Sequence, residues 1–256
     1  MTLLRVLHAE ALKMKRTIAL KMVLIAPVAV GLLILFVASQ APFSMLRRNG
    51  AGGEWMELVR LNLLVWALLM LPLFITLETA LVAGLDHAEN QWKNLLARPV
   101  PRWTLYVAKL LVVMAMTAAS TAMLLCGVLL TGAVLPRLQP EVHFGFPVPL
   151  AAIVRQGAEV AGLAFLALTI QHWVSLRWRA FSVATGVGIL AMVTSYLMVV
   201  SSRQTGAWPQ YFPWSLPMLV LARPPQNIDA VLWISVAIGL AVTAAGCSDF
   251  CRREVN

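Results

Sequence analysis

Residues 77–109 read LETALVAGLDHAENQWKNLLARPVPRWTLYVAK, a mixed polar and apolar segment that interrupts an otherwise apolar chain. Its large apolar residues fall at roughly helical spacing: Leu85, Trp92, Leu95 and Leu96. Because Pro99 and Pro101 lack a backbone donor and restrict the residues before them, we predict a short amphipathic helix over residues 85–99. Such a helix between two apolar runs suits the docking of a soluble partner, or it rests in the headgroup layer of a membrane. The pattern leaves both interpretations open.

The composition places most of the chain in lipid. Of 256 residues, 60% are hydrophobic and 12% charged, with a mean hydropathy of +0.81, whereas soluble domains carry about a quarter charged residues. Since one span needs about 20 residues, the chain has room for about five to seven spans and no soluble catalytic domain. The net charge is +9, and the basic residues lie at span ends. This placement favours anionic lipid over nucleic acid as their partner.

Six apolar runs are long enough to cross a bilayer. The predicted spans are residues 18–38, 61–84, 106–135, 150–174, 181–200 and 228–246. Between them we expect polar loops at residues 40–59 and 136–149, and a kink in the second span at Pro72. The first span could also be read as a secretory signal, but its basic leader is too long and its apolar run too extended, so we expect no cleavage.

Residues 1–17 precede the first span and predict an amphipathic helix in the membrane interface. One stripe is apolar: Leu4, Leu7, Ala11 and Met14. The basic side chains lie elsewhere on the helix: Arg5, His8, Lys13 and Arg16. Residues 201–227 are rich in Pro and aromatic residues and predict an interfacial or re-entrant segment. The side chains expected at headgroup depth are Trp208, Tyr211, Phe212 and Trp214.

Six spans put both termini on one side of the membrane, and the distribution of charge indicates which side. With both termini inside, seven of the twenty Lys and Arg residues lie outside: Arg47, Arg48, Arg60, Arg137, Arg155, Arg203 and Arg223. The other thirteen lie inside, as the positive-inside rule requires. We therefore predict cytoplasmic termini and a cytoplasmic helix at residues 85–99.

Charged residues inside predicted spans are the candidates for a functional role. Glu78 lies about two turns inside the second span, where a bare carboxylate costs several kcal/mol, so we consider a proton relay, a substrate contact or a polar tie to another span, the tie being favoured. Arg155 and Glu159 are four residues apart and predict a structural ion pair on one helix face. Small residues at helical spacing predict close helix packing: Ala180, Ala184, Gly188, Ala237, Ala241 and Ala245.

Other chemistry finds no support in the sequence. No G-x-x-x-x-G-K-[ST] motif occurs, so we expect no ATP hydrolysis by this chain. The four histidines show no metal-ligand spacing, and no Ser/His/Asp set can be assembled. Cys126, Cys247 and Cys251 give no disulfide framework and are expected to be free thiols. We expect a non-enzymatic chain that binds no cofactor or metal itself.

Two stretches carry a resemblance to a known family. Residues 7–27 read LHAEALKMKRTIALKMVLIAP, a basic amphipathic helix that enters the first span, and residues 72–111 end the second span in PLFITLETALVAGLDHAENQWKNLLARPVPRWTLYVAKLL. Together they resemble the membrane permeases of the ABC-2 exporter family, in particular the small bacterial subunits of bacitracin and lantibiotic-immunity type. The resemblance extends over most of the chain, and no motif is evident after Val134.

The resemblance implies an all-α fold in a single domain over residues 1–256, located in the bacterial cytoplasmic membrane. It implies two permease subunits, identical or related, each docked to a separate P-loop ATPase that binds ATP and Mg²⁺. Residues 85–99 would be the coupling helix, with a gating or coupling role for Glu78. The implied docking residues are Asp86, Glu89, Trp92, Lys93, Leu95 and Leu96. The cargo is open and includes hydrophobic or peptide antibiotics.

Two other functional classes remain. A secondary transporter could carry protons on Glu78 and Glu159, but residues 173–180 are too short to mirror the segment at 85–99 as an inverted repeat would. A membrane assembly protein without transport activity is the other alternative. A membrane-embedded enzyme ranks last, because no cluster of His, Asp or Glu faces inward in the predicted spans.

Overall fold

A computed structural model describes residues 3–15, 17–40, 53–88, 101–140, 142–178, 180–205, 211–222 and 226–252, with the backbone alone for 86–88 and 202–205. All regular structure in these ranges is helical. The predicted helix at residues 85–99 lies mostly outside them: α5 continues to Ala88, and residues 89–100 are not described.

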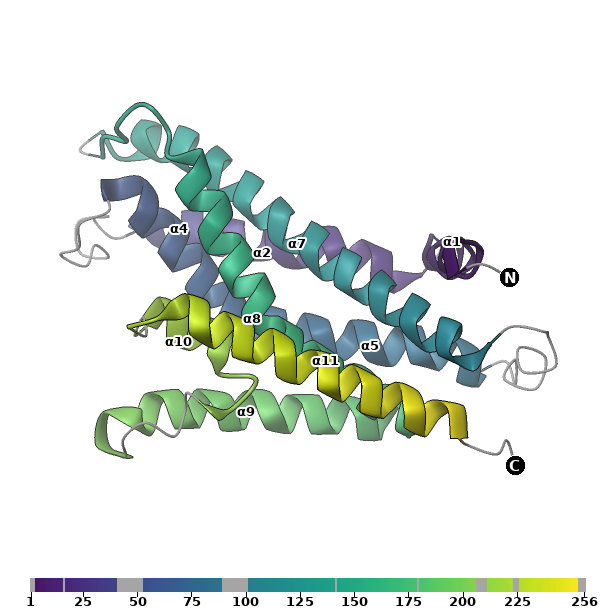
Figure 1. Ribbon diagram of the computed structural model, residues 1–256. Coiled ribbons are helices and arrows are strands. Elements are labelled where there is room, and N and C mark those ends of the chain that lie inside the picture. Colours follow the sequence, from purple (N-terminus) through teal and green to yellow (C-terminus); the bar gives the residue numbers. More distant parts are fainter. Residues whose placement is uncertain are drawn as a thin grey trace.

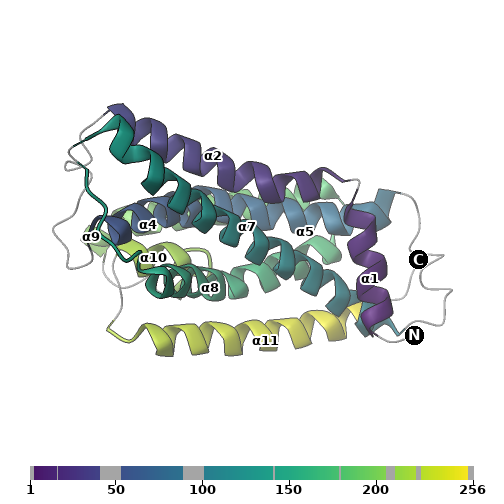
Figure 2. The same cartoon turned by 90° about the horizontal axis from the view of Figure 1, so that it is seen from above.

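Within the described ranges, six helices are long and apolar enough to cross a membrane, which agrees with the predicted number of spans. The first is α2 (Ile18–Gln40), and the second is the continuous run of α4 (Gly53–Val65), η1 (Trp66–Met70) and α5 (Leu71–Ala88). The others are α7 (Arg102–Leu138), α8 (Leu150–Arg177), α9 (Phe181–Thr205) and α11 (Ile228–Arg252). They form one elongated bundle, and α1 (Leu3–Met14) lies crosswise at one end of it (Figures 1 and 2).

The second span begins earlier than predicted. Glu54 and Glu57, expected in a polar loop, lie in α4. The loop prediction is wrong there because Glu57 forms an ion pair with Arg60 one turn along the same helix, which reduces the cost of carrying both charges into the span. The wide π turn η1 ends at Met70, two residues before Pro72. In a regular α-helix the proline ring would clash with the carbonyl four residues earlier, and the wider turn makes room for it.

Helix α1 buries a different face from the predicted one. Val6, Glu10 and Met14 are buried, whereas Leu4 is 75% exposed and Ala11 is also exposed. The buried stripe is therefore rotated away from the predicted one. The rotation brings the carboxylate of Glu10 into the interior, where it meets a lysine on α7.

The long helix α7 is held to the first span by hydrogen bonds at two levels. Ser120 Oγ donates to the carbonyl of Val23 at 3.0 Å, and Gln139 Nε2 donates to the carbonyl of Ala38 at 2.6 Å. These bonds, with the shared apolar core between the two helices, keep α2 and α7 in register along most of their length.

Glycines rather than alanines give α11 its close contacts. A Cβ at Gly239 would lie 2.7 Å from the ring of Phe165 on α8. The predicted packing alanines of α11 are all exposed within this chain: Ala237, Ala241 and Ala245. On α9 the prediction fits better, since Ala184 is buried and a Cβ at Gly188 would collide with Thr76 on α5.

The segment between the fifth and sixth spans contains the short helix α10 (Leu216–Ala222). Its Leu216 and Val220 pack on Leu163 and Leu166 of α8. Trp214 is only 7% exposed within the bundle, and its place at headgroup depth stays a prediction. Tyr211 is 75% exposed, and Trp208 lies outside the described residues.

The two ends of the bundle differ in content. One end, called here the α1 end, gathers α1, the end of α5, the start of α7, the junction of α8 with α9 and the end of α11 (Figure 1). The opposite end, called the far end, gathers the end of α2, the start of α4, the linker from α7 to α8, and α10 (Figure 1). The undescribed residues 89–100 connect two helices that both stop at the α1 end.

Candidate functional site: a buried polar cluster at the α1 end

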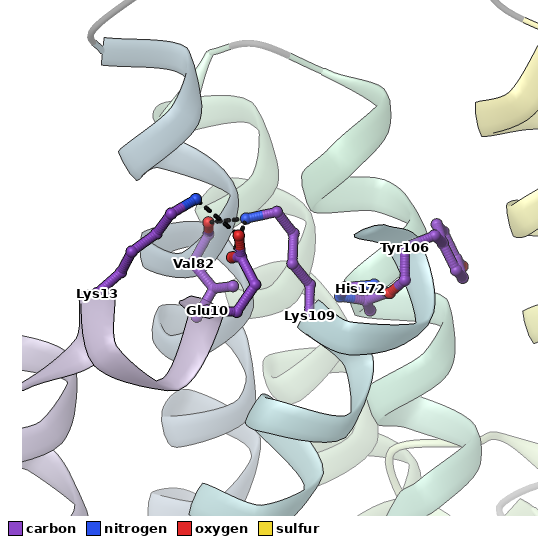
Figure 3. A network of polar contacts seen from close by, with 6 residues as sticks. All are labelled: Glu10, Lys13, Val82, Tyr106, Lys109 and His172. Atoms are coloured by element: carbon purple, nitrogen blue, oxygen red, sulfur yellow. Dashed lines mark hydrogen bonds and ion pairs between the residues drawn. The ribbon is translucent and has the colours of Figure 1, made fainter. Parts of the chain in front are cut away.

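A lysine and a glutamate meet inside the bundle at the α1 end. Lys109 Nζ of α7 lies 2.7 Å from Glu10 Oε2 of α1, and their side chains are 1% and 3% exposed. Lys13 Nζ binds the other oxygen of Glu10 at 2.6 Å from a position that is 30% exposed. Figure 3 shows both ammonium groups converging on the one carboxylate.

A third helix enters the same cluster through its backbone. Lys109 Nζ also donates to the carbonyl of Val82 on α5 at 3.3 Å. One ammonium group thus joins α1, α5 and α7. We call Glu10, Lys13, Lys109 and the carbonyl of Val82 the Glu10–Lys109 cluster (Figure 3).

Because the Glu10–Lys109 pair is buried, its contribution to stability depends on how well its desolvation is offset. Two charges removed from water are tolerated only when geometry and extra hydrogen bonds offset their desolvation. Here the carboxylate accepts from two ammonium groups, and Lys109 has a second acceptor in Val82. Removing one partner of such a pair costs about 3–5 kcal/mol, whereas replacing both by apolar residues is often neutral.

One turn before Lys109, Tyr106 of α7 packs against His172 of α8. Their ring centroids are 4.8 Å apart in an edge-to-face arrangement, and His172 Nε2 lies 3.3 Å from the carbonyl of Tyr106. Both residues are almost fully buried. The Tyr106 hydroxyl and His172 Nδ1 have no hydrogen-bond partner among the residues that the structure describes.

The end of α11 completes this region. Gly246 lets the Tyr106 hydroxyl approach, since a Cβ there would lie 2.3 Å from it. Asp249 accepts from Trp173 Nε1 of α8 at 3.0 Å, and Arg102 Nη1 at the start of α7 donates to the carbonyl of Cys251 at 3.2 Å. The first turn of α7 is therefore tied to the last turn of α11.

Glu78 lies on α5, one turn from Val82 and on the same side of the helix. It is 0% exposed, and neither carboxylate oxygen has a hydrogen-bond partner within the described ranges. Its neighbour Thr79 accepts from Ser175 of α8 at 3.1 Å. The structure therefore shows no polar tie from Glu78 to another described span, although such a tie was the favoured sequence-based interpretation.

The other predicted residues are distributed differently. Arg155 Nε donates to Glu159 Oε1 at 2.8 Å. Both residues lie in the first part of α8, towards the far end of the bundle and away from the Glu10–Lys109 cluster. Asp86 lies in the last turn of α5, where only the backbone is described. The remaining docking candidates lie outside the described residues: Glu89, Trp92, Lys93, Leu95 and Leu96.

Sequence reasoning missed Glu10, Tyr106 and His172 and counted Lys109 only as a cytoplasmic charge. Two signals were available. Glu10 is the one acidic residue in residues 3–14, four residues from both Val6 and Met14, and Lys109 is embedded in the apolar run LYVAKLLVV. A basic and an acidic residue, each isolated on an otherwise apolar helix face, are candidates to pair.

The far end holds a cavity of about 550 Å³ with mostly apolar walls, including Trp55, Phe144 and Phe146. The indole nitrogen of Trp55 is already bonded to the carbonyl of Gly145 at 3.0 Å. In the part of the chain that the structure describes, no group of three or more His, Cys, Asp or Glu residues could hold a metal ion. Of the ion pairs between described residues that join two different helices, the one buried on both sides, Glu10–Lys109, lies at the α1 end.

Comparison with known proteins identifies the class of this bundle. The model of ABC-2 family transporter proteins matches residues 6–200, from α1 to near the end of α9, and a search of curated proteins finds no match. The match covers well over half of the 256 residues, and the six apolar helices agree with a multi-pass membrane protein. The chain therefore belongs to the ABC-2 family of transporter proteins.

Proposed function

We propose that this chain is the membrane-spanning permease subunit of an ATP-driven exporter. A separate P-loop ATPase binds ATP and Mg²⁺, and this chain, paired with a second permease subunit, carries the cargo outward across the membrane. The observation that carries the proposal is the family match over residues 6–200. Six membrane-length helices support it by giving the chain the body of a permease.

The proposed docking element is the segment at residues 85–99. Its flanks support this role, because α5 ends and α7 begins at the α1 end, beside α1 and the end of α11. A segment held at both ends by packed helices transmits force better than a free loop does. The proposed contacts to the ATPase are Asp86, Glu89, Trp92, Lys93, Leu95 and Leu96.

The α1 end is proposed to face the cytoplasm of a bacterial cell. Exposed basic side chains gather at this end: Arg5, Lys15, Lys21 and Arg252. Such residues favour the side of the membrane on which the chain is synthesised, and they suit the anionic headgroups there. The same placement makes residues 85–99 accessible to a soluble ATPase.

Purification of the tagged chain from its own host in mild detergent tests the proposal. A P-loop ATPase is expected to copurify with the wild type, and Trp92→Ala combined with Leu95→Asp is expected to lower its recovery at least about tenfold, because an apolar hot spot is replaced by a charge. Recovery is measured by quantitative mass spectrometry. The matched control is Phe146→Asp, a change at an 88% exposed position at the far end.

The control variant is expected to retain the ATPase. The docking role is refuted if the double variant elutes as a monodisperse protein and still retains its ATPase. Absence of any ATPase from the wild-type preparation counts against the exporter proposal itself. The cargo class, with apolar or peptide antibiotics as the first candidates, is left to transport assays on the assembled complex.

Proton-coupled transport is a second candidate, and one observation favours it. Glu78 is fully buried and has no hydrogen-bond partner among the described residues. A carboxyl group that takes up a proton in one conformation and releases it in another is expected to have such surroundings in one of the two conformations. The other predicted proton carrier, Glu159, is instead paired with Arg155. This candidate requires a flux that survives ATP depletion and is lost in Glu78→Gln.

A further inference from the structure

We propose that Glu10 and Lys109 are positioning residues that make α1 move as one body with the paired ends of α5 and α7. The inference rests on the proposed function, because it concerns how a displacement of residues 85–99 reaches the first span. It gives α1 a role in transmission that resting at the membrane surface would not require.

The position of the Glu10–Lys109 cluster supports this role. Val82 lies six residues before the end of α5, and Lys109 lies seven residues after the start of α7. At 1.5 Å per residue, the cluster is about 10 Å from the ends of both helices. It therefore joins the two helices that flank residues 89–100 close to where a docked partner would displace them.

The burial of the pair makes the connection a rigid one. The side chains of Glu10 and Lys109 are 3% and 1% exposed, so water cannot replace either partner. Separation would leave a charge unpaired in a dry interior. The spacing between α1, α5 and α7 is therefore kept when these elements shift as a rigid body.

A short hydrogen-bonded turn links α1 to the first span and transmits the displacement of α1 to it. Thr17 binds the carbonyl of Met14 twice, through its amide at 3.0 Å and its hydroxyl at 2.8 Å. The first span, α2, begins at the next residue, Ile18. The path thus leads from the ends of α5 and α7 through Lys109 and Glu10 into α1, and from there into α2.

The test uses the complex of the full chain with its copurified ATPase in proteoliposomes. The main variant is Glu10→Leu with Lys109→Met, which replaces the ion pair by apolar residues of similar size and is expected to fold. The matched control is Arg155→Met, which removes the exposed partner of Glu159 at the far end and leaves the Glu10–Lys109 cluster intact. Thermal unfolding and ATPase recovery are measured for each variant.

Spin labels measure the motion itself. In a background with Cys126, Cys247 and Cys251 replaced, one label pair joins α1 to α7 at Leu4→Cys and Trp103→Cys, and a second joins α1 to the far end of the bundle at Leu4→Cys and Leu150→Cys, all at exposed positions. Distances are recorded without nucleotide and after trapping with ATP and vanadate. In the wild type, the α1–α7 distance is expected to stay fixed while the distance from α1 to the far end changes.

In the double variant, the distribution of α1–α7 distances is expected to broaden, the change in distance from α1 to the far end to disappear, and stimulation of the ATPase by the permease to fall about fivefold or more. ATPase recovery and the unfolding temperature are expected to stay near wild type. The control variant is expected to behave as the wild type does. If the double variant does not fold, Glu10→Gln with Lys109→Gln replaces it, since it removes both charges together and leaves neither unpaired.

Two results overturn the proposal in distinguishable ways. A folded double variant in which the distance from α1 to the far end changes as in the wild type shows that the buried pair does not position α1. A wild type that binds no ATPase, or shows no ATP-dependent change in either distance, removes the proposed function and this inference with it.

Discussion

Two buried glutamates in this chain differ in their surroundings. Glu10 accepts from two lysines, whereas Glu78 is equally buried and has no hydrogen-bond partner in the described residues. A buried polar group without a partner persists where function requires it or where another conformation supplies the partner. The two acids therefore invite different experiments: Glu10 is tested as a structural connection, and Glu78 as a group that changes partners.

Glu78→Gln keeps the size of the side chain and removes its titratable group. Under the exporter proposal with a gating role for Glu78, the variant is expected to fold with an unchanged unfolding temperature and to transport several-fold more slowly at an unchanged dependence on ATP. Ion or dye flux in proteoliposomes, with and without ATP, measures this. A flux that is driven by a pH gradient without ATP, and that vanishes in this variant, would instead support the proton-coupled candidate.

The residues of the candidate site were only partly predictable. Glu78 was found because one acidic residue in an apolar run is conspicuous by itself. Glu10 and Lys109 are 99 residues apart, and each lies near the end of a helix, where a charge is ordinarily solvated by headgroups. The isolation of each charge on an apolar helix face marks it as a candidate to pair, but the choice of partner depends on the packing of three helices, which no local pattern reports.

At the level of elements, apolar run length predicted six spans, and the described part of the chain contains six helices long and apolar enough to be spans. The errors lie at the ends. The second span begins at Gly53 because an ion pair within α4 makes its charges tolerable, and α7 extends from Arg102 to Leu138, beyond the apolar run at both ends. Hydropathy locates the lipid-crossing part of a helix, while its full length is set by contacts at the ends.

Packing of α11 at the α1 end can be tested at Gly246. A Cβ there would lie 2.3 Å from the Tyr106 hydroxyl and 3.0 Å from the ring of Trp173, so Gly246→Ala is expected to destabilise the fold by about 1–3 kcal/mol through overpacking. The control is Gly127→Ala, where nothing lies within 4 Å. It is expected to leave stability unchanged or to raise it, since alanine favours helix.

Thermal unfolding in detergent measures both glycine variants. Equal unfolding temperatures for the two would show that α11 can move away from α7 and α8 at no cost. The predicted alanine stripe on α11 failed for a related reason: small residues mark where a helix can be approached closely, but which face is approached depends on the positions of the neighbouring helices.

At the scale of the whole molecule, the asymmetry between the ends makes orientation measurable. In a background with Cys126, Cys247 and Cys251 replaced, Phe146→Cys at the far end is expected to react with a membrane-impermeant maleimide on intact cells. His8→Cys on the exposed face of α1 is expected to react only after permeabilisation. Gel shifts of the labelled protein measure this, and the opposite pattern would place residues 85–99 outside and exclude docking to a cytoplasmic ATPase.

Span number and the placement of α1 and the end of α11 at one end of the bundle were predictable from the sequence, because an even number of apolar runs returns the chain to the side on which it began. The family was identified from the resemblance in residues 7–27 and 72–111, which agrees with the family match over residues 6–200. Features that depend on tertiary contacts were not predictable: the buried face of α1, the burial of Trp214 and the apolar cavity at the far end.

The π turn at Trp66–Met70 changes the direction in which the later side chains of the second span point around the helix axis. A π turn inserts one residue into the α-helical count, which offsets everything beyond it by about 100°. At the first residue of the turn, Trp66 points towards Thr121 of α7; beyond the turn, Glu78 and Thr79 are both turned inward. Without that offset, a straight helix continued from α4 would place Glu78 a quarter-turn or more away around the helix axis. The π turn therefore determines which neighbouring helices Glu78, more than two turns further along the span, can contact.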